Sequence, residues 1–432
     1  MFSERTNWKL ARNRFTQALE EVRAGGTKIL DLTVSNPTRA GLRYDEAAIL
    51  RALASPRALD YDPQSKGLLA AREAVAGYYR DRSGRGGSDV ARNVASEGID
   101  VDPERIVLTT STSEGYSFVF RLLCNAGDEL LVPKPSYPLF EFLADLQDVR
   151  LVPYPLIYDH GWQMDFPSLE RAVTQRTRGV VVVHPNNPTG SFVSAGEVEL
   201  LNSFCRERGL AVIADEVFLD YGLETSGAKA PTQAELYRSA ESAAPPKGEP
   251  APPRCEPHRS FAGNREALTF TLSGLSKIAA LPQMKVAWVV TSGPGELAAQ
   301  AMGRLEVIAD TYLSMNAPVQ WAVPALLEQR KDIQRQLLDR VRQNLAELDR
   351  QLTQRKACSR LAVEGGWYAV VRVPVTRSDE ELAIELVREK AVVVHPGHFY
   401  DFAGDGYLVL SLITELGEFK EGISRVIRNF SS

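Results

Sequence analysis

The sequence predicts an α/β protein with a three-layer αβα large domain, built on a mostly parallel seven-stranded sheet, and a small α+β domain. Between residues 105 and 291, short β-branched runs alternate with longer helical patterns, as they do in βαβ units. After residue 353 this alternation stops, and strands and helices follow in another order. The length of 432 residues is enough for two or three domains.

Seven apolar runs are the predicted strands of the large sheet: 105–109, 129–132, 150–154, 179–183, 210–214, 268–272 and 285–291. Helical patterns between them cover 114–124, 137–146 and 195–208, and polar or glycine residues follow each of them. Open α/β sheets bind ligands beyond the carboxyl ends of their strands, so polar residues at those positions are the candidate site.

The remaining elements set the predicted domain limits. A Pro/Ala-rich interval at 223–266 interrupts the strand rhythm and is interpreted as a partly flexible insertion, and 317–352 reads as one long amphipathic helical stretch. Later strands are expected at 367–373, 392–395 and 407–412, with helices at 378–390 and 418–429. The large domain is therefore predicted at 51–316, and the small domain at 1–50 together with 317–432.

Composition and charge exclude several function classes. Fifty basic and 55 acidic residues give a net charge of −5 without a basic run, which argues against nucleic-acid binding. The four cysteines, Cys124, Cys205, Cys255 and Cys358, form no CxxC pair, so a reducing compartment is expected. The polar amino terminus and the lack of a long apolar run predict a cytoplasmic protein without a membrane span.

Common metal, hydrolase and nucleotide motifs give little support for other chemistries. There is no HExxH, no GxSxG and no Walker A lysine loop, and His395 and His398 flank a Pro-Gly pair that cannot form one helical face. No metal site is therefore predicted. The string Gly293-Pro-Gly-Glu-Leu-Ala298 matches a relaxed dinucleotide fingerprint, but its position late in the sheet favours an ordinary strand-to-helix turn.

Five polar segments follow predicted strands. They are the hydroxyl-rich stretch with Ser111, Thr112 and Ser113, the Pro-Ser-Tyr-Pro stretch with Tyr137, the Asn-Asn-Pro-Thr-Gly stretch with Asn187, the acid Asp215, and Ser276-Lys277. Hydroxyls and amides at a helix N-terminus can receive a phosphate, although the first stretch taken alone is better explained as a plain helix cap. An acid directly after an apolar strand is costly to bury unless it is paired.

This combination, in this order and over almost the whole chain, resembles the pyridoxal-phosphate (PLP) aminotransferases of fold type I, in the class I/II group that includes aspartate aminotransferase. The resemblance implies that Lys277 forms a Schiff base with the PLP aldehyde and then moves the substrate Cα proton. It implies that Asp215 keeps the pyridine nitrogen protonated, that Asn187 contacts the 3′-oxygen and that Tyr137 stacks on the ring. The residues it assigns to the phosphate are Ser111, Thr112, Ser113, Ser276, Lys285 and, from a neighbouring subunit, Tyr61.

The same resemblance implies a homodimer with shared active sites, an amino acid or amine as donor and a 2-oxo acid as acceptor. Several positions depart from the family. Lys285 replaces a phosphate-binding arginine, Phe218 a tyrosine and Gly274 a serine, whose hydroxyl is expected at Ser273 or Ser276 instead. Val409 replaces the arginine that binds the substrate carboxylate. The candidate replacements lie in the amino-terminal segment: Asn36, Arg39 and Arg43.

Because substrate anchoring decides which Cα bond is broken, the loss of that arginine leaves a PLP-dependent decarboxylase or lyase open beside the transaminase. A non-catalytic PLP-binding relative is a second alternative, against which the presence of Lys277 argues. An NAD-dependent oxidoreductase, the third, depends on the 293–298 string alone.

Overall fold

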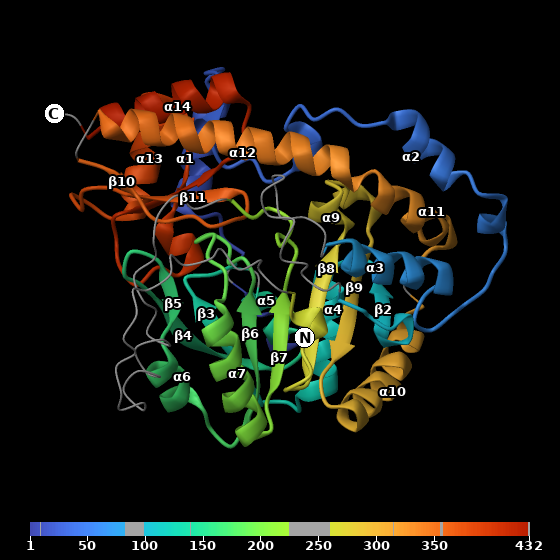
Figure 1. Ribbon diagram of the computed structural model, residues 1–432. Helices are drawn as coiled ribbons and strands as arrows, with labels where there is room; N and C mark the ends of the chain where they lie inside the picture. Colours follow the sequence, from blue (N-terminus) through green and yellow to red (C-terminus); the bar gives the residue numbers. More distant parts are fainter. Residues whose placement is uncertain are drawn as a thin grey trace, which may run out of the picture.

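The computed structural model describes residues 1–8, 10–82, 99–138, 140–223, 260–313, 315–354 and 357–430, and Figure 1 shows how they are arranged. Most of the predicted insertion, residues 224–259, and Cys255 with it, lies outside this part of the chain. The described residues 260–266 are not an excursion, because Ser260, Phe261 and Ala262 are buried and start the return into the large sheet.

The large sheet has eight strands in the order β2-β9-β8-β7-β6-β3-β4-β5. Their bounds are β2 Ile106–Thr109, β3 Glu129–Lys134, β4 Arg150–Tyr158, β5 Trp162–Met164, β6 Thr177–Val183, β7 Ala211–Asp215, β8 Thr269–Gly274 and β9 Ala287–Ser292. Strands β9 and β5 run against the other six. The predicted count of seven is therefore wrong by one. Strand β5 has three residues, too few to leave a periodic pattern, and it is defined by its pairing with the end of β4.

Helices cover both faces of this sheet, which confirms the three-layer fold (Figure 1). Neighbouring residues of β6 point to opposite cores: Val181 and Val183 pack under α4 (Thr112–Leu123), α5 (Phe140–Asp145) and α10 (Gly295–Tyr312). Val180 and Val182 pack against α6 (Phe166–Ala172) and α7 (Ala195–Arg208). This two-sided burial explains why the central strands are continuous apolar runs.

A second, smaller sheet has the order β10-β11-β14-β13 and is antiparallel, with a separate parallel pair β1-β12 beside it. The bounds are β1 Leu30–Asp31, β10 Ser359–Arg360, β11 Tyr368–Arg372, β12 Val392–Val393, β13 His395–Pro396 and β14 Tyr407–Ser411. Helices α1 (Arg14–Ala24), α12 (Arg330–Thr353), α13 (Asp379–Lys390) and α14 (Leu416–Arg428) share its core. The amino-terminal residues thus join the carboxyl-terminal ones through β1.

The stretch predicted as one helix at 317–352 is two helices. Helix α11 (Ala317–Glu328) packs against α2 (Glu46–Leu53) and α3 (Leu69–Arg82), and α12 starts after Gln329 and reaches the small sheet (Figure 1). The amphipathic pattern continues through the junction of α11 and α12, so the end of the first helix could not be predicted from the sequence. Among the described residues no helix has both the length and the apolar character needed to span a membrane.

Candidate active site

The carboxyl ends of four strands bring the predicted site residues to one edge of the large sheet. Val183 at the end of β6 pairs with Asp215, and Asp215 pairs with Leu272 of β8. At the next strand, Gly274 pairs with Ala287, which also pairs with Thr109 at the end of β2. The segments that carry Asn187, Asp215, Lys277, Lys285 and the start of α4 therefore emerge side by side.

Asp215 is a buried carboxylate at the end of β7, with 8% of its surface exposed. The Tyr116 hydroxyl donates to Oδ2 at 3.0 Å and the Val217 N–H donates to Oδ1 at 3.1 Å. Burial raises the pKa of Asp215 to about 6, although these two hydrogen bonds and the charge on Lys277 act in the other direction. A cationic ring nitrogen against this carboxylate would lower its pKa again and offset the cost of its burial.

Lys277 lies in α9 (Leu275–Ile278), a helix of one turn directly after β8. Its Nζ lies 4.9 Å from the centre of the Trp367 ring, 5.5 Å from that of Phe218 and 3.5 Å from the carbonyl oxygen of Ser35. Burial lowers the pKa of Lys277 to about 8, against the opposing effect of Asp215. About a tenth of this amine is then neutral at pH 7, far more than for an ordinary lysine, which suits a nucleophile.

The two neighbouring asparagines at 186 and 187 have different hydrogen-bond environments. The side chain of Asn186 accepts from the Thr189 hydroxyl at 3.0 Å and donates to the Ser136 hydroxyl at 3.3 Å, so it holds the loop together. Asn187 is buried, and within the described chain its side-chain oxygen has no hydrogen-bond partner. A buried acceptor without a donor is costly, and a 180° turn of this amide about χ2 would instead present its NH2 group to a ligand oxygen.

A phosphate cradle is available at the start of α4. Ser111 is the N-cap, and its hydroxyl accepts from the Glu114 N–H at 3.1 Å. The first turn leaves the amides of Thr112 and Ser113 without acceptors inside the helix, and a helix N-terminus attracts anions. Lys285, exposed and with a φ of 53°, comes two residues before β9 at the same edge.

The serine that the resemblance expects at Gly274 does not fit there. A Cβ at Gly274 would lie 2.8 Å from the carbonyl oxygen of Val286, because β8 and β9 approach closely at this point. The hydroxyl has not moved to Ser273 either, since Ser273 is 1% exposed and donates to the carbonyl of Glu216 at 3.3 Å. Ser276, which is partly exposed, is the remaining candidate.

Tyr137 and Tyr61 stand apart from this group in exposure. Tyr137 is 39% exposed and packs edge-on against Phe140 at the start of α5; its partial burial and the charge of Asp215 raise its pKa to about 12, which places it near the carboxylate. Tyr61 is 82% exposed and lines a cavity of about 300 Å³ with Arg57, Gln64 and Trp321. No contact joins Tyr61 to Lys277 or Asp215 within the described residues of this subunit.

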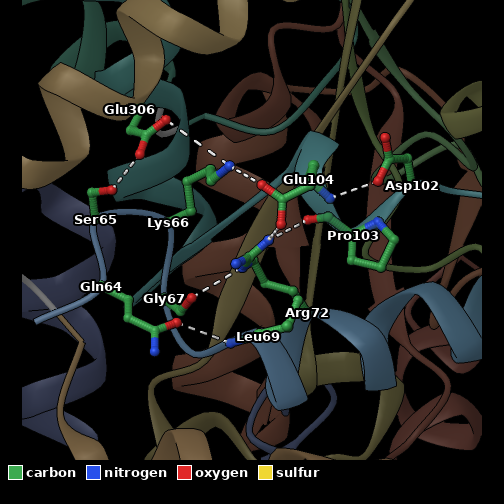
Figure 2. Close-up of polar contacts among 10 residues, drawn as sticks. All are labelled: Gln64, Ser65, Lys66, Gly67, Leu69, Arg72, Asp102, Pro103, Glu104 and Glu306. Atoms are coloured by element: carbon green, nitrogen blue, oxygen red, sulfur yellow. Dashed lines mark hydrogen bonds and ion pairs between the residues drawn. The ribbon is translucent and has the colours of Figure 1, made fainter. Parts of the chain in front are cut away.

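The segment after Tyr61 is fixed firmly, as Figure 2 shows. Lys66 forms ion pairs with Glu104 and, at 3.9 Å, with Glu306, and Ser65 donates to Glu306 at 2.6 Å. Arg72 binds Glu104 at 2.8 Å and the carbonyl of Gly67 at 3.0 Å. These contacts, here called the Lys66 clamp, tie the segment that follows Tyr61 to Glu104, just before β2, and to Glu306 on α10.

Val409 lies where the resemblance expects an arginine, and it is 1% exposed. It pairs with Val370 of β11 and with His395 of β13, so aliphatic groups and an imidazole surround this position. The Asn36 side chain accepts from the Thr38 N–H at 3.1 Å and caps a short turn. Arg39 and Arg43 follow in the same segment as Ser35; both are exposed and neither side chain has an ion pair within the described residues.

The sequence did not identify two side chains that touch the central residues. Tyr116 donates to Asp215, and Trp367 lies against Lys277. Tyr116 sits one turn into α4 and Trp367 lies 90 residues beyond Lys277, so only the tertiary fold brings them in. No local pattern could have found them.

The dinucleotide-like string at Gly293 lies away from the candidate site. Strand β9 is antiparallel to β8, so the turn at Gly293 and the start of α10 lie at the edge of the sheet opposite Asp215. That is a strand-to-helix turn, away from the ligand edge. Within the described chain no group of three or more His, Cys, Asp or Glu side chains is arranged to hold a metal ion.

Comparisons with known proteins agree with this arrangement. The family model described as aminotransferase class I and II matches residues 27–415. A glutamate-pyruvate aminotransferase of Haemophilus influenzae is 25% identical over 414 residues, which cover 94% of this chain and 91% of that protein. An alanine aminotransferase of Mycobacterium tuberculosis is 26% identical over 405 residues, covering 91% and 83%.

Solved structures show the same fold. The alanine aminotransferase of Pyrococcus furiosus has a TM-score of 0.82 at 20% identity, over 100% of both chains. The aspartate aminotransferase of Thermotoga maritima has a TM-score of 0.77 at 17% identity, again over 100% of both chains.

Proposed function

Because the chain belongs to the aminotransferase class I and II family, it is a PLP-dependent transaminase, and we propose that Lys277, Asp215 and Asn187 form its catalytic centre. The observation that carries this proposal is a half-buried amine and a buried carboxylate at one sheet edge, each with a pKa moved toward neutrality. A merely structural pair would not need the adjacent unpartnered amide of Asn187.

Each residue has a separate task. Bound PLP supplies the electron sink for the negative charge that develops at the substrate Cα. Asp215 would keep the ring nitrogen protonated, with Tyr116 and the Val217 amide holding the carboxylate in its orientation. Lys277 would hold the cofactor and, when free, carry the Cα proton at its Nζ. Asn187 would donate to the 3′-oxygen, and Tyr137 would contact the ring.

The phosphate is proposed to lie at the N-terminus of α4. Its ligands are Ser111, Thr112, Ser113, Ser276 and Lys285, and a partner subunit would add its copy of Tyr61. Lys285 gives charge without the two-pronged geometry of arginine, so the amides of the helix start carry more of the anion. The 82% exposure of Tyr61 and the cavity beside it support a homodimer with shared sites.

The substrates are proposed to be an α-amino acid donor and a 2-oxo acid acceptor. The relatives are named glutamate-pyruvate and alanine aminotransferases, which favours transamination over the decarboxylase and lyase alternatives and makes glutamate, alanine and pyruvate the first substrates to test. A cytoplasmic location is proposed as well, because Cys124, Cys205 and Cys358 are free thiols.

Adding candidate donors singly to the PLP-loaded protein tests the function. A true donor should convert the absorbance of the Lys277-linked cofactor to that of pyridoxamine phosphate, and pyruvate should reverse it. Borohydride reduction followed by peptide mapping should find the cofactor on Lys277, and Lys277→Ala should bind PLP without the reducible link. Cofactor recovered on another lysine would reject the proposed centre.

The carboxylate anchor has its own test. With Val409 at the expected arginine position, Arg39 or Arg43 is the proposed cation, because the Ser35 carbonyl places the start of their segment 3.5 Å from Lys277 Nζ. Arg39→Ala or Arg43→Ala should raise KM for the donor about ten-fold while leaving kcat and the cofactor spectrum unchanged, as loss of uniform binding does. Unchanged KM values in both variants would place the anchor elsewhere.

A further inference from the structure

The turn that carries Lys277 is held by side chains from distant parts of the chain. The last four carbonyls of a helix have no donor within the helix, and α9 has four residues in all. The Lys277 carbonyl oxygen accepts from the Ala280 N–H at 3.2 Å and, at 2.6 Å, from the hydroxyl of Tyr221. The shorter contact is therefore made by a side chain that follows β7, not by the turn itself.

Tyr221 cannot easily move away from this position. It is 0% exposed, and its ring packs edge-on against Trp367 at 5.1 Å. Trp367 is also the ring nearest to Lys277 Nζ. Of these two packed rings, Tyr221 thus holds the backbone carbonyl of Lys277 and Trp367 lies against its amine.

Gln334 holds the next carbonyl from another direction. It lies on α12, is 5% exposed, and its Nε2 donates to the Ile278 carbonyl at 2.9 Å and to Asp220 Oδ2 at 2.8 Å. Further along the same helix, Asn344 donates to the carbonyls of Leu412 and Thr414, beyond β14. Helix α12 therefore connects the small sheet directly to the turn that carries Lys277.

We propose that Tyr221 and Gln334 are positioning residues for the Lys277 reaction. They fix the backbone of α9 so that Nζ stays within reach of both the cofactor and the substrate Cα, and neither of them touches the reacting atoms. This inference rests on the proposed function, since it takes Lys277 as the reacting amine. A small displacement of a reacting group costs rate much more than it costs binding.

Tyr221→Phe removes one hydroxyl and keeps the ring. We expect kcat to fall about ten-fold with KM for the donor within about two-fold, because the lost interaction acts on the reaction step. The pH midpoint of the bound cofactor's absorbance should shift as well, because it reports the surroundings of Nζ. The matched control is Tyr154→Phe: Tyr154 is 1% exposed and donates to the carbonyl of Val181 at 2.8 Å. The Tyr154→Phe variant should show a decrease in Tm similar to that of Tyr221→Phe, but its kcat and the pH midpoint of its cofactor absorbance should be unchanged.

Gln334→Leu tests the second contact independently. Its matched control is Gln351→Leu on the same helix, since Gln351 Nε2 likewise donates to a carboxylate, Glu347, at 2.8 Å and to a carbonyl, that of Lys420, at 2.9 Å. Gln334→Leu should lower kcat and shift the midpoint, and Gln351→Leu should do neither. If Tyr221→Phe does not fold, this pair decides the question.

The outcomes separate the two proposals. If the wild-type protein forms no reducible link at Lys277, the proposed function fails. If the wild type forms the link and turns over, but Tyr221→Phe and Gln334→Leu behave like their controls, the positioning role alone is overturned.

Discussion

At the scale of single residues, Asp215 and Lys277 alter each other's acid–base behaviour. Burial pushes both toward their neutral forms, while each charge stabilises the other. PLP would change this balance, because a protonated ring nitrogen would take over the role of counter-charge to Asp215. In the cofactor-free protein Asp215 is therefore the counter-charge of the amine and keeps the pKa of Lys277 higher than burial alone would.

The rate of covalent PLP uptake should consequently rise with pH around a midpoint near 8, the pKa to which burial lowers Lys277. The sign follows because only the neutral amine attacks the aldehyde, and an ordinary lysine would give a midpoint above about 10. Stopped-flow absorbance of the cofactor-free protein mixed with PLP, over a range of pH, measures it.

Asp215→Asn gives the internal check on this prediction. The charge of Asp215 raises the pKa of Lys277, so its removal should move the uptake midpoint to lower pH. A midpoint that stays in place or moves upward would mean that the two groups are not coupled in the cofactor-free protein.

The residue types of the site could be predicted, but their partners could not. Asn187, Asp215 and Lys277 follow predicted strands, and parallel strands must end at one edge. The residues that contact them are far apart in the sequence: Tyr116 lies in α4, Trp367 just before β11 and Tyr221 in the loop after β7. Their contacts therefore exist only in the folded chain. The loss of a serine at Gly274 also has a tertiary cause, the close approach of β9.

At the scale of elements, Glu216 fixes the point where the chain re-enters the large sheet. It is 1% exposed, and its carboxylate accepts from the Ser260 hydroxyl at 2.5 Å and from the Phe261 N–H at 2.6 Å. Because Glu216 adjoins Asp215, this contact also supports the end of β7. Sequence patterns assigned residues 260–266 to an insertion, since a contact with an acid 44 positions earlier leaves no local signal.

Glu216→Gln should change the pH dependence of stability. Burial raises the pKa of Glu216 to about 7, so between about pH 4.5 and pH 7 the folded state keeps a proton that the unfolded chain has lost. The free energy of unfolding therefore falls as pH rises through that window, and the amide removes this contribution. When the pH rises from 5 to 8, the free energy of unfolding of the variant should therefore increase by about 2–3 kcal/mol relative to that of the wild type.

Urea unfolding of the cofactor-free proteins at the two pH values measures that difference. Equal pH dependence in both proteins would mean that Glu216 is already ionised in the folded state at low pH.

At the scale of the whole molecule, the chain connects its two sheets at several places. Besides α12, the amino-terminal segment packs α1 on α13 of the small sheet region. It also reaches the large sheet region, where Arg5 pairs with Asp148 and Trp8 donates to Asp145 at 2.8 Å. Composition and periodicity predicted both sheets, but such long-range ties depend on single side chains and were not predictable.

The side chain of Tyr61 is exposed on the surface of the subunit. The Lys66 clamp ties the segment after Tyr61 to the rest of the subunit (Figure 2), whereas Tyr61 itself is 82% exposed and its hydroxyl has no hydrogen bond within the described residues. An exposed aromatic hydroxyl beside a tethered segment is suited to complete a site on another copy of the chain. The proposed shared site can therefore be tested by complementation.

Mixed dimers of Lys277→Ala and Tyr61→Phe subunits, purified by two different tags, carry that test. If each site takes Lys277 from one subunit and Tyr61 from the other, the mixed dimer contains one site with both residues intact and one site with neither. It should bind PLP at one site with wild-type affinity and show about half of wild-type activity, although the Lys277→Ala homodimer is inactive and the Tyr61→Phe homodimer binds PLP weakly. If each subunit completed its own site, every site of the mixed dimer would carry one defect, and no site would bind PLP covalently with wild-type affinity. Activity no higher than half that of the Tyr61→Phe homodimer would therefore reject sharing through Tyr61, whatever the oligomeric state.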